Sequence, residues 1–276
     1  MLEGGCMSHQ IEQGQKILAA LWQQYIEVTP SAAKIHQLLA PYQPIINDHI
    51  ALRGFAFPGL DITSLSQSFL QCGYQWQQDY VFPKKHLRAK HFSHPSGKLP
   101  HIFISELLWQ NLSVSVQQIL RPIMEAACNA LSAQVLEPNV GRVWPLRYQQ
   151  YLTLAQASEY AAWLAAWGFR ANHFTVAVHR LTGIQDLAQL NRLLLENGFA
   201  LNQGGGEIKG SASDGLVQSA TLADQAEVQF SDRVCTIPSC FYEFAYRYPL
   251  SSGALFQGFV PESADRIFES TDRVTK

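Results

Sequence analysis

Residues 47–55 read NDHIALRGF, and a second stretch, residues 172–180, reads NHFTVAVHR. Each stretch sets a histidine within a strand-like run and continues through a glycine-containing turn into a helical pattern that ends at a glycine. From the histidine to that glycine there are 24 residues in the first copy (49 to 73) and 25 in the second (173 to 198). The repeat predicts a duplicated strand–helix module that brings two equivalent histidines together at a pseudo-twofold axis.

The pattern around each copy extends it to a β-α-β-β-β module. The strand expected at 241–247 closes the second module, as the strand at 101–107 closes the first. We therefore expect an α+β fold and a single domain over residues 1–276, with both modules forming one curved mixed sheet around a metal site. The expected boundaries are about 45–110 and 170–250 for the modules, 8–41 for a helical leader and 112–168 for a helical linker.

Proline and serine residues set the expected helix boundaries. Pro30 is expected to end the first leader helix, and Ser31 to cap a second one that runs to Ala40. In the linker, one helix is expected from Ser113 to Gln134 with a kink or break at Pro122. A further continuous helix is expected over about 154–167.

Composition excludes several classes of partner. The chain is 47% hydrophobic and 15% charged with a net charge of −2, so it lacks the clustered positive charge that nucleic-acid binding needs. No apolar stretch approaches the roughly 20 residues that cross a bilayer, and the N-terminus lacks an export signal. Five cysteines without metal-type pairing are typical of reduced thiols. We expect a cytoplasmic protein with no membrane or nucleic-acid partner; its oligomeric state is left open.

Alternation along the strands indicates a metal site. Because successive side chains point to opposite faces, His49 and Arg53 share one face of their strand, and Glu243 and Arg247 share one face of the last strand. Together with His173 this gives two imidazoles and one carboxylate, the ligand set of non-haem Fe(II) sites with open positions. Manganese or zinc could occupy the same ligands. The alternative for each histidine is a hydrogen-bonded core or surface residue.

Several other side chains compete for roles at this site. Glu106 is the rival carboxylate, but matching Phe103 to Phe241 puts Ser105 at the position of Glu243. His179 is expected at the rim of the pocket. The remaining histidines are expected in supporting or surface roles: His86, His91, His94 and His101. The loop at 204–206 is interpreted as a flexible lid.

The two arginines suit a substrate with carboxylates. Arg53 and Arg247 each lie four residues past a predicted ligand and on the ligand's own face. A guanidinium there pairs with a carboxylate in bidentate fashion. A structural ion pair is the alternative for both.

At this point the motifs resemble those of a known family. The stretches NDHIALR (47–53), SEYAAW (158–163), NHFTV (172–176) and FYEF (241–244) look like the 2-oxoadipate dioxygenase/decarboxylase family, and the resemblance covers nearly the whole chain. It implies a fold similar to the vicinal-oxygen-chelate superfamily. It also implies Fe(II)-dependent conversion of 2-oxoadipate and O₂ to 2-hydroxyglutarate and CO₂, late in lysine breakdown.

The resemblance also implies roles for particular residues. His49, His173 and Glu243 would be the iron ligands, and Arg53 the catalytic residue that contacts the substrate carboxylate. His49 and His173 would also border the substrate, while a distal contact from Arg247 is inferred from spacing alone. Other functions stay open: a glyoxalase-type isomerase, a metal-dependent hydrolase, or a metal-free module that binds small molecules.

Overall fold

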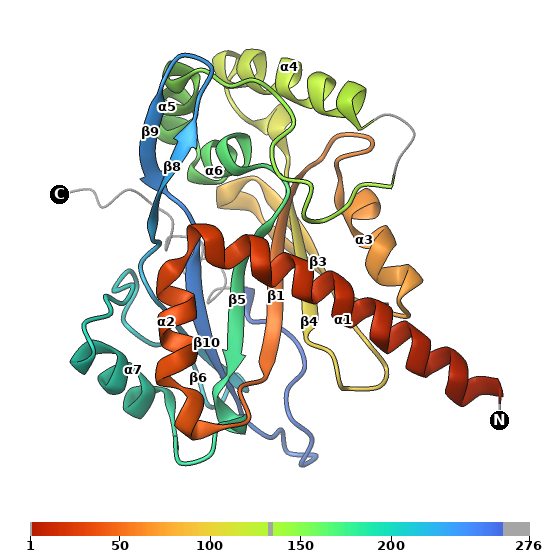
Figure 1. The fold of residues 1–276 in the computed structure, drawn as a ribbon, viewed down its shortest axis with the longest axis vertical. Helices are drawn as coiled ribbons and strands as arrows, with labels where there is room; N and C mark the ends of the chain where they lie inside the picture. Colours follow the sequence, from red (N-terminus) through yellow and green to blue (C-terminus); the bar gives the residue numbers. More distant parts are fainter. Residues whose placement is uncertain (1, 132–134, 262–276) are drawn as a thin grey trace.

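The architecture is one eight-stranded mixed sheet with helices around it (Figure 1). The computed structural model describes residues 2–131 and 135–261. The strand order is β2-β3-β4-β1-β5-β10-β7-β6, and β8 and β9 form a separate hairpin. The strands of the large sheet are β1 (Asn47–Phe55), β2 (Gln75–Phe82), β3 (Leu87–Ser93), β4 (His101–Leu107), β5 (Ala171–Ala177), β6 (Lys209–Ser211), β7 (Leu216–Ala220) and β10 (Phe241–Arg247); the hairpin pairs β8 (Gln225–Gln229) with β9 (Val234–Pro238).

The sheet consists of two similar halves joined at β1 and β5. Within each half the first strand runs parallel to the last, β1 beside β4 and β5 beside β10, while β1 and β5 pair antiparallel. The module helices α3 (Ile62–Gln71) and α7 (Leu187–Glu196) occupy equivalent places. Both begin with an aspartate cap: Asp61 accepts from the Ser64 N–H and Asp186 from the Gln189 N–H. The α+β class and the duplicated strand–helix modules are as expected.

Helices cover the apolar face of the sheet. The long helix α1 (Leu2–Val28) crosses the strands (Figure 1). Its Trp22 ring contacts Phe174 of β5, with 5.0 Å between the ring centroids. On the same face, α7 contacts β7 through a hydrogen bond from Ser219 to Asn191. Ile50, Phe174 and Phe244 point into this buried layer, so the alternate residues of their strands face the opposite, concave side.

Three details of the helices differ from expectation. Pro30 is the first residue of α2 (Pro30–Leu38). Its missing N–H costs no hydrogen bond there, because the first N–H groups of a helix have no partner within the helix. Pro122 lies inside α4 (Val114–Ala130), which continues through it; the predicted end at Gln134 lies outside the described residues. The last linker helix is two helices, α5 (Tyr148–Ala157) and α6 (Glu159–Trp167), because Ser158 caps the second by accepting from the Ala161 N–H.

No helix among the described residues has the length and apolar character needed to span a membrane.

Candidate metal centre

Two β-bulges shape the centre of the sheet. The pairing of β1 with β5 has two irregular steps, in which Asp48 and Asn172 are the extra residues. A bulge inserts one residue into a strand and re-aims the side chains beside it. Each extra residue directly precedes a predicted ligand, His49 or His173. The duplicated strands therefore carry a matched pair of bulged dipeptides.

Three predicted ligands converge on the concave side of these strands. His49, His173 and Glu243 each offer a donor atom, and these atoms lie within 4.8 Å of one another. Glu243 Oε1 lies 3.4 Å from His49 Nε2, and its Oε2 lies 3.2 Å from His173 Nε2. Ligands bound at roughly 2.0–2.2 Å to one ion stand about 3 Å apart, so this spacing suits one metal.

The bulged residues orient both imidazoles. His49 Nδ1 lies 2.8 Å from Asp48 Oδ1, and His173 Nδ1 lies 3.1 Å from Asn172 Oδ1. With these oxygens accepting a hydrogen bond from each Nδ1–H, the Nε2 lone pair of each ring is directed at Glu243. A second polar partner on the far nitrogen is what metal-binding histidines usually have.

The three side chains are buried, which makes an ionised carboxylate among them unfavourable unless a cation is bound. Glu243 is 0% exposed and accepts 2.6 Å from Gln218 Nε2, while burial raises the pKa of its carboxyl. Within the described residues, its Oε2 accepts no hydrogen bond. Burial, followed by the nearby His49 and Arg53, lowers the pKa of His173 well below its usual value. Two imidazoles beside a buried carboxylate form a donor set that a divalent transition metal fits.

Arg247 forms the structural ion pair that was expected from the sequence as its alternative role. Its Nε and Nη2 donate to Asp48 at 2.6 and 2.8 Å, and its Nη1 donates to the carbonyls of Phe256 and Gly258. Burial acts to raise the pKa of the Asp48 carboxyl, but Arg247 and the His49 hydrogen bond hold it well below its usual range. The structure thus contains the ion pair with Asp48, and a contact of Arg247 with a distal substrate carboxylate stays a prediction.

Arg53 lies at the other end of the same strand. Its Nη1 donates to Glu159 at 2.8 Å, and its guanidinium stands 4.6 Å from the Tyr160 ring and 4.9 Å from the Trp163 ring. The side chain is 1% exposed. It is close enough to the metal face to influence the pKa of His173. The first turns of α6 therefore hold a buried cation beside the predicted ligands, in keeping with the site face expected for Arg53.

The rival carboxylate is engaged elsewhere, and the register explains why. Glu106 accepts from the Ile62 N–H at the start of α3 and from Arg88. In the sheet, His101 lies beside His49 as Phe241 lies beside His173. Two residues further along each strand, Phe103 of β4 is therefore the equivalent of Glu243 of β10. The predicted match of Ser105 with Glu243 was wrong.

Two of the other histidines lie near the triad. His91 and His101 are at most partly exposed, and their rings stand 5.8 Å apart on the concave side of β3 and β4. Burial first, then neighbouring positive charge, lowers the pKa of His91 to about 3. His179 Nδ1 accepts from the Arg247 N–H, at the edge of a cavity of about 390 Å³ that also borders Asp48 and His101. His86 lies away from the triad, at a left-handed turn (φ 55°) that borders another cavity, of about 260 Å³.

The glycine loop at 204–206 is tied down rather than open. Gly204 N–H donates to Asn202, and Glu207 accepts from Asn191 and Gln203. These bonds give no support to the predicted lid.

One segment at the site carried no recognisable sequence signal. Phe259 lies beyond the last strand, yet it is 5% exposed and its ring stands 4.7 Å from the His49 ring. Its N–H donates to Tyr80, a residue 179 positions away. Only the folded sheet brings these two together.

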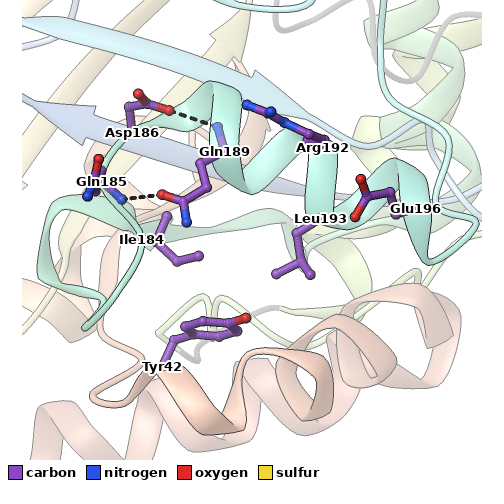
Figure 2. Close-up of a pocket in the computed structure, with 8 residues that line it drawn as sticks. All are labelled: Tyr42, Ile184, Gln185, Asp186, Gln189, Arg192, Leu193 and Glu196. Atoms are coloured by element: carbon purple, nitrogen blue, oxygen red, sulfur yellow. Dashed lines mark hydrogen bonds between the residues drawn. The ribbon is translucent and has the colours of Figure 1, made fainter.

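A separate cavity lies outside the metal centre. It measures about 470 Å³ and lies between Tyr42 and the residues of α7, with Gln189 bonded to Asp186 and Gln185 at one end (Figure 2). None of its lining residues belongs to the triad.

Comparisons with known proteins agree on one family. A family model described as 2-oxoadipate dioxygenase/decarboxylase matches residues 7–143 and 140–255. The chloroplastic 2-oxoadipate dioxygenase/decarboxylase of Arabidopsis thaliana is 35% identical over 286 residues, covering 93% of this chain and 77% of that protein.

Solved structures align with most of the chain. Hydroxyglutarate synthase from Oryza sativa, in complex with 2-oxoadipate, aligns with a TM-score of 0.89 at 33% identity, covering 97% of this chain and 93% of that one. A protein of Shewanella frigidimarina, provisionally named a hydrolase, aligns with a TM-score of 0.85 at 47% identity, covering 90% and 98%. A glyoxalase-superfamily protein of Ralstonia eutropha shares the fold, with a TM-score of 0.72 at 19% identity, covering 91% and 86%. The vicinal-oxygen-chelate type of fold is thereby confirmed.

Proposed function

The chain belongs to the 2-oxoadipate dioxygenase/decarboxylase family, and on that premise we propose that it converts 2-oxoadipate, or a similar 2-oxo acid, and O₂ to 2-hydroxyglutarate and CO₂. The six carbons of 2-oxoadipate are divided between a five-carbon hydroxy acid and CO₂. Both atoms of O₂ enter the products, so no second organic substrate is required. The observation that carries the proposal is the buried His49–His173–Glu243 cluster, in which Asp48 and Asn172 orient the two imidazoles through Nδ1.

We infer that Fe(II) is the ion held by these three residues. Two imidazoles and one carboxylate leave further positions for a chelating substrate and for O₂, and iron supplies the redox chemistry with O₂ when it is bound. Glu243 contributes the only negative charge among the three ligands. Gln218 fixes the orientation of that carboxylate through its 2.6 Å hydrogen bond.

The protein's own contribution is orientation and exclusion of water. The Asp48 and Asn172 oxygens hold the imidazole protons on Nδ1, so each Nε2 stays available at the site. The three side chains are at most 5% exposed, which keeps bulk water from competing for the ion. A dry site of this kind also limits side reactions of an activated substrate.

Arg53 is proposed to contact the substrate carboxylate. Its guanidinium is buried, lies on the ligand face of β1 and contacts the Tyr160 and Trp163 rings. Substrate binding at this arginine would require the carboxylate to share it with Glu159, or to displace Glu159. The Tyr160 and Trp163 rings would keep the guanidinium in place during that exchange.

The deciding experiment combines metal analysis with O₂ consumption. Protein purified without oxygen is loaded with Fe(II) and supplied with a panel of 2-oxo acids that includes 2-oxoadipate. We expect O₂ uptake with equal release of CO₂ and a hydroxy acid one carbon shorter. Glu243→Ala is expected to abolish uptake, because the ion loses its only anionic ligand.

Two other reactions predict different results. The Shewanella frigidimarina protein's name makes hydrolysis the second candidate. Turnover that continues without O₂, or that survives replacement of Fe(II) by Zn²⁺, would favour a hydrolase or an isomerase. A protein that binds 2-oxo acids with no metal and no turnover would be a binding module.

A further inference from the structure

The chain after β10 folds back over the metal centre as a strap, which we define as residues 248–259. Its start is fixed because the Tyr248 N–H donates to the Gly215 carbonyl, and it turns back so that the Phe256 N–H donates to Tyr248. Arg247 Nη1 then holds the returning chain through the carbonyls of Phe256 (2.9 Å) and Gly258 (2.8 Å). The strap therefore has a defined path, and that path ends beside the triad.

The end of the strap inserts an aromatic ring into the concave side of the sheet. The Phe259 ring stands 4.7 Å from the His49 ring, 5.0 Å from Phe103 and 5.2 Å from His91. Its backbone N–H donates 3.2 Å to the Tyr80 hydroxyl, which is itself 2.9 Å from His91 Nδ1. Phe259 thus fills the part of the concave side formed by the first module, next to a predicted ligand.

The second module presents a different surface to the same centre. There Gln218 donates to Glu243, and Lys209 lies opposite Gln218 in the sheet and lowers the pKa of the Glu243 carboxyl against the effect of burial. The first side of the centre is therefore filled by a ring from the strap, whereas the second side combines polar side chains with Phe241 of β10, whose ring stands 4.6 Å from the His173 ring. On the first side, a substrate held at the triad would meet the Phe259 ring.

We propose that Phe259 is a specificity-determining residue, the wall that limits the size of the 2-oxo acid on the first-module side of the metal centre. This inference rests on the proposed function, because it assigns a residue that selects among 2-oxo acids. An extended side chain would keep clear of the wall, whereas a bulky ring next to the keto group would collide with Phe259. The strap hydrogen bonds fix the backbone, so Phe259 as a whole cannot withdraw without breaking the Tyr80 and Arg247 hydrogen bonds.

The test compares two 2-oxo acids in Fe(II)-loaded wild type, Phe259→Leu and Phe259→Ala. The probes are 2-oxoadipate and phenylpyruvate, whose ring has the size of the side chain that is removed. We expect kcat/KM for phenylpyruvate relative to 2-oxoadipate to rise roughly tenfold or more in Phe259→Ala, and less in Phe259→Leu, as expected for space made in an apolar pocket. A ratio within about twofold of wild type in both folded variants would overturn the proposal.

Phe256→Leu is the matched control. Its ring lies in the same strap but contacts Gly215 and Gly258, so its loss loosens the strap without removing the wall. We expect its substrate ratio to match wild type; a rise equal to that of Phe259→Ala would assign the effect to strap mobility and sink the proposal. If Phe259→Ala fails to fold, Phe259→Leu and the opposite change, Phe259→Trp, which should lower the ratio, still decide.

If the proposed function is wrong, wild type will show no O₂ uptake with any of the 2-oxo acids. The wall is then tested by binding, through the change in visible absorption when either acid is added to Co²⁺-loaded protein. Phenylpyruvate binding that improves in Phe259→Ala supports the wall, and unchanged affinities overturn it.

Discussion

Arg247 holds the Asp48 carboxylate with two nitrogens, Nε at 2.6 Å from Oδ2 and Nη2 at 2.8 Å from Oδ1, and both side chains are buried. Asp48 in turn bonds His49 Nδ1. The orientation of a predicted metal ligand on β1 therefore depends on an arginine at the end of β10, and on the strap carbonyls that the same arginine binds.

Arg247→Lys should weaken metal binding. Lysine keeps the charge but cannot reproduce two parallel bonds to Asp48, so His49 loses a fixed orientation. Loss of such supporting contacts typically costs 10–100-fold in metal affinity or activity, and we expect about that loss in a metal titration. Arg192→Lys, an exposed change on α7, is the control. Equal affinities in wild type and Arg247→Lys would separate the ion pair from the metal centre.

Glu243→Gln should have opposite effects with and without metal. Burial raises the pKa of the Glu243 carboxyl above its value in the unfolded chain. The free energy of unfolding of the metal-free protein therefore falls as pH rises from the ordinary carboxyl pKa through the pKa in the folded protein. At pH 8 without metal, the glutamine variant is therefore expected to have the higher free energy of unfolding. Added metal should stabilise wild type, by ~2.7 kcal/mol at a hundred times the Kd, and the variant far less. Thermal unfolding with and without the metal measures both; similar gains in the two proteins would remove Glu243 from the ligand set.

Arg53→Lys should lower turnover while metal content stays constant. A planar guanidinium between Tyr160 and Trp163 holds a carboxylate in one orientation, which an ammonium cannot. A lost charged hydrogen bond is worth about 1.5–3 kcal/mol, so kcat/KM for 2-oxoadipate should fall roughly 10–100-fold. Glu159→Gln is the comparison, because it breaks the ion pair and keeps Arg53. If the arginine is only structural, both variants lose stability and neither changes its kinetics.

His91 should make the protein less stable in mild acid. Burial is the largest cause that lowers its pKa to about 3, while an unfolded histidine titrates near 6.5. Between those values the unfolded chain binds the extra proton, so the free energy of unfolding falls as pH is lowered, by up to ~1.4 kcal/mol per pH unit. His91→Gln should reduce this slope between pH 4 and 6, measured by urea unfolding. An unchanged slope would show that His91 is protonated in the folded protein.

The strands and the triad could be predicted because both follow from local periodicity. Alternation within residues 47–55 fixes which side chains share a face, and the repeat at 172–180 implies that two such faces meet. The last strand was expected at 241–247 and is found there. These features require only the nearest neighbours along the chain and one duplication.

The remaining features depend on register and on distant contacts. The bulges at Asp48 and Asn172 are properties of how β1 pairs with β5, and neither strand shows them alone. The equivalence of Phe103 and Glu243 was missed because two phenylalanines suggested a shifted match. The Tyr80–Phe259 hydrogen bond joins segments with no common motif. Sequence patterns thus predict the ligands better than the residues that support and enclose them.

The paired bulges let two neighbouring residues of a strand direct their side chains to the same site. In a regular strand only every second residue faces a given side, so a ligand and its hydrogen-bond partner cannot be neighbours in sequence. The bulges lift that limit, and Asp48-His49 and Asn172-His173 each carry a ligand together with the oxygen that orients it. Each dipeptide therefore contains both the ligand and its hydrogen-bond partner, and the two modules repeat this pair together. Because one copy is charged and the other neutral, the duplicates have already diverged in a way that leaves their geometry intact.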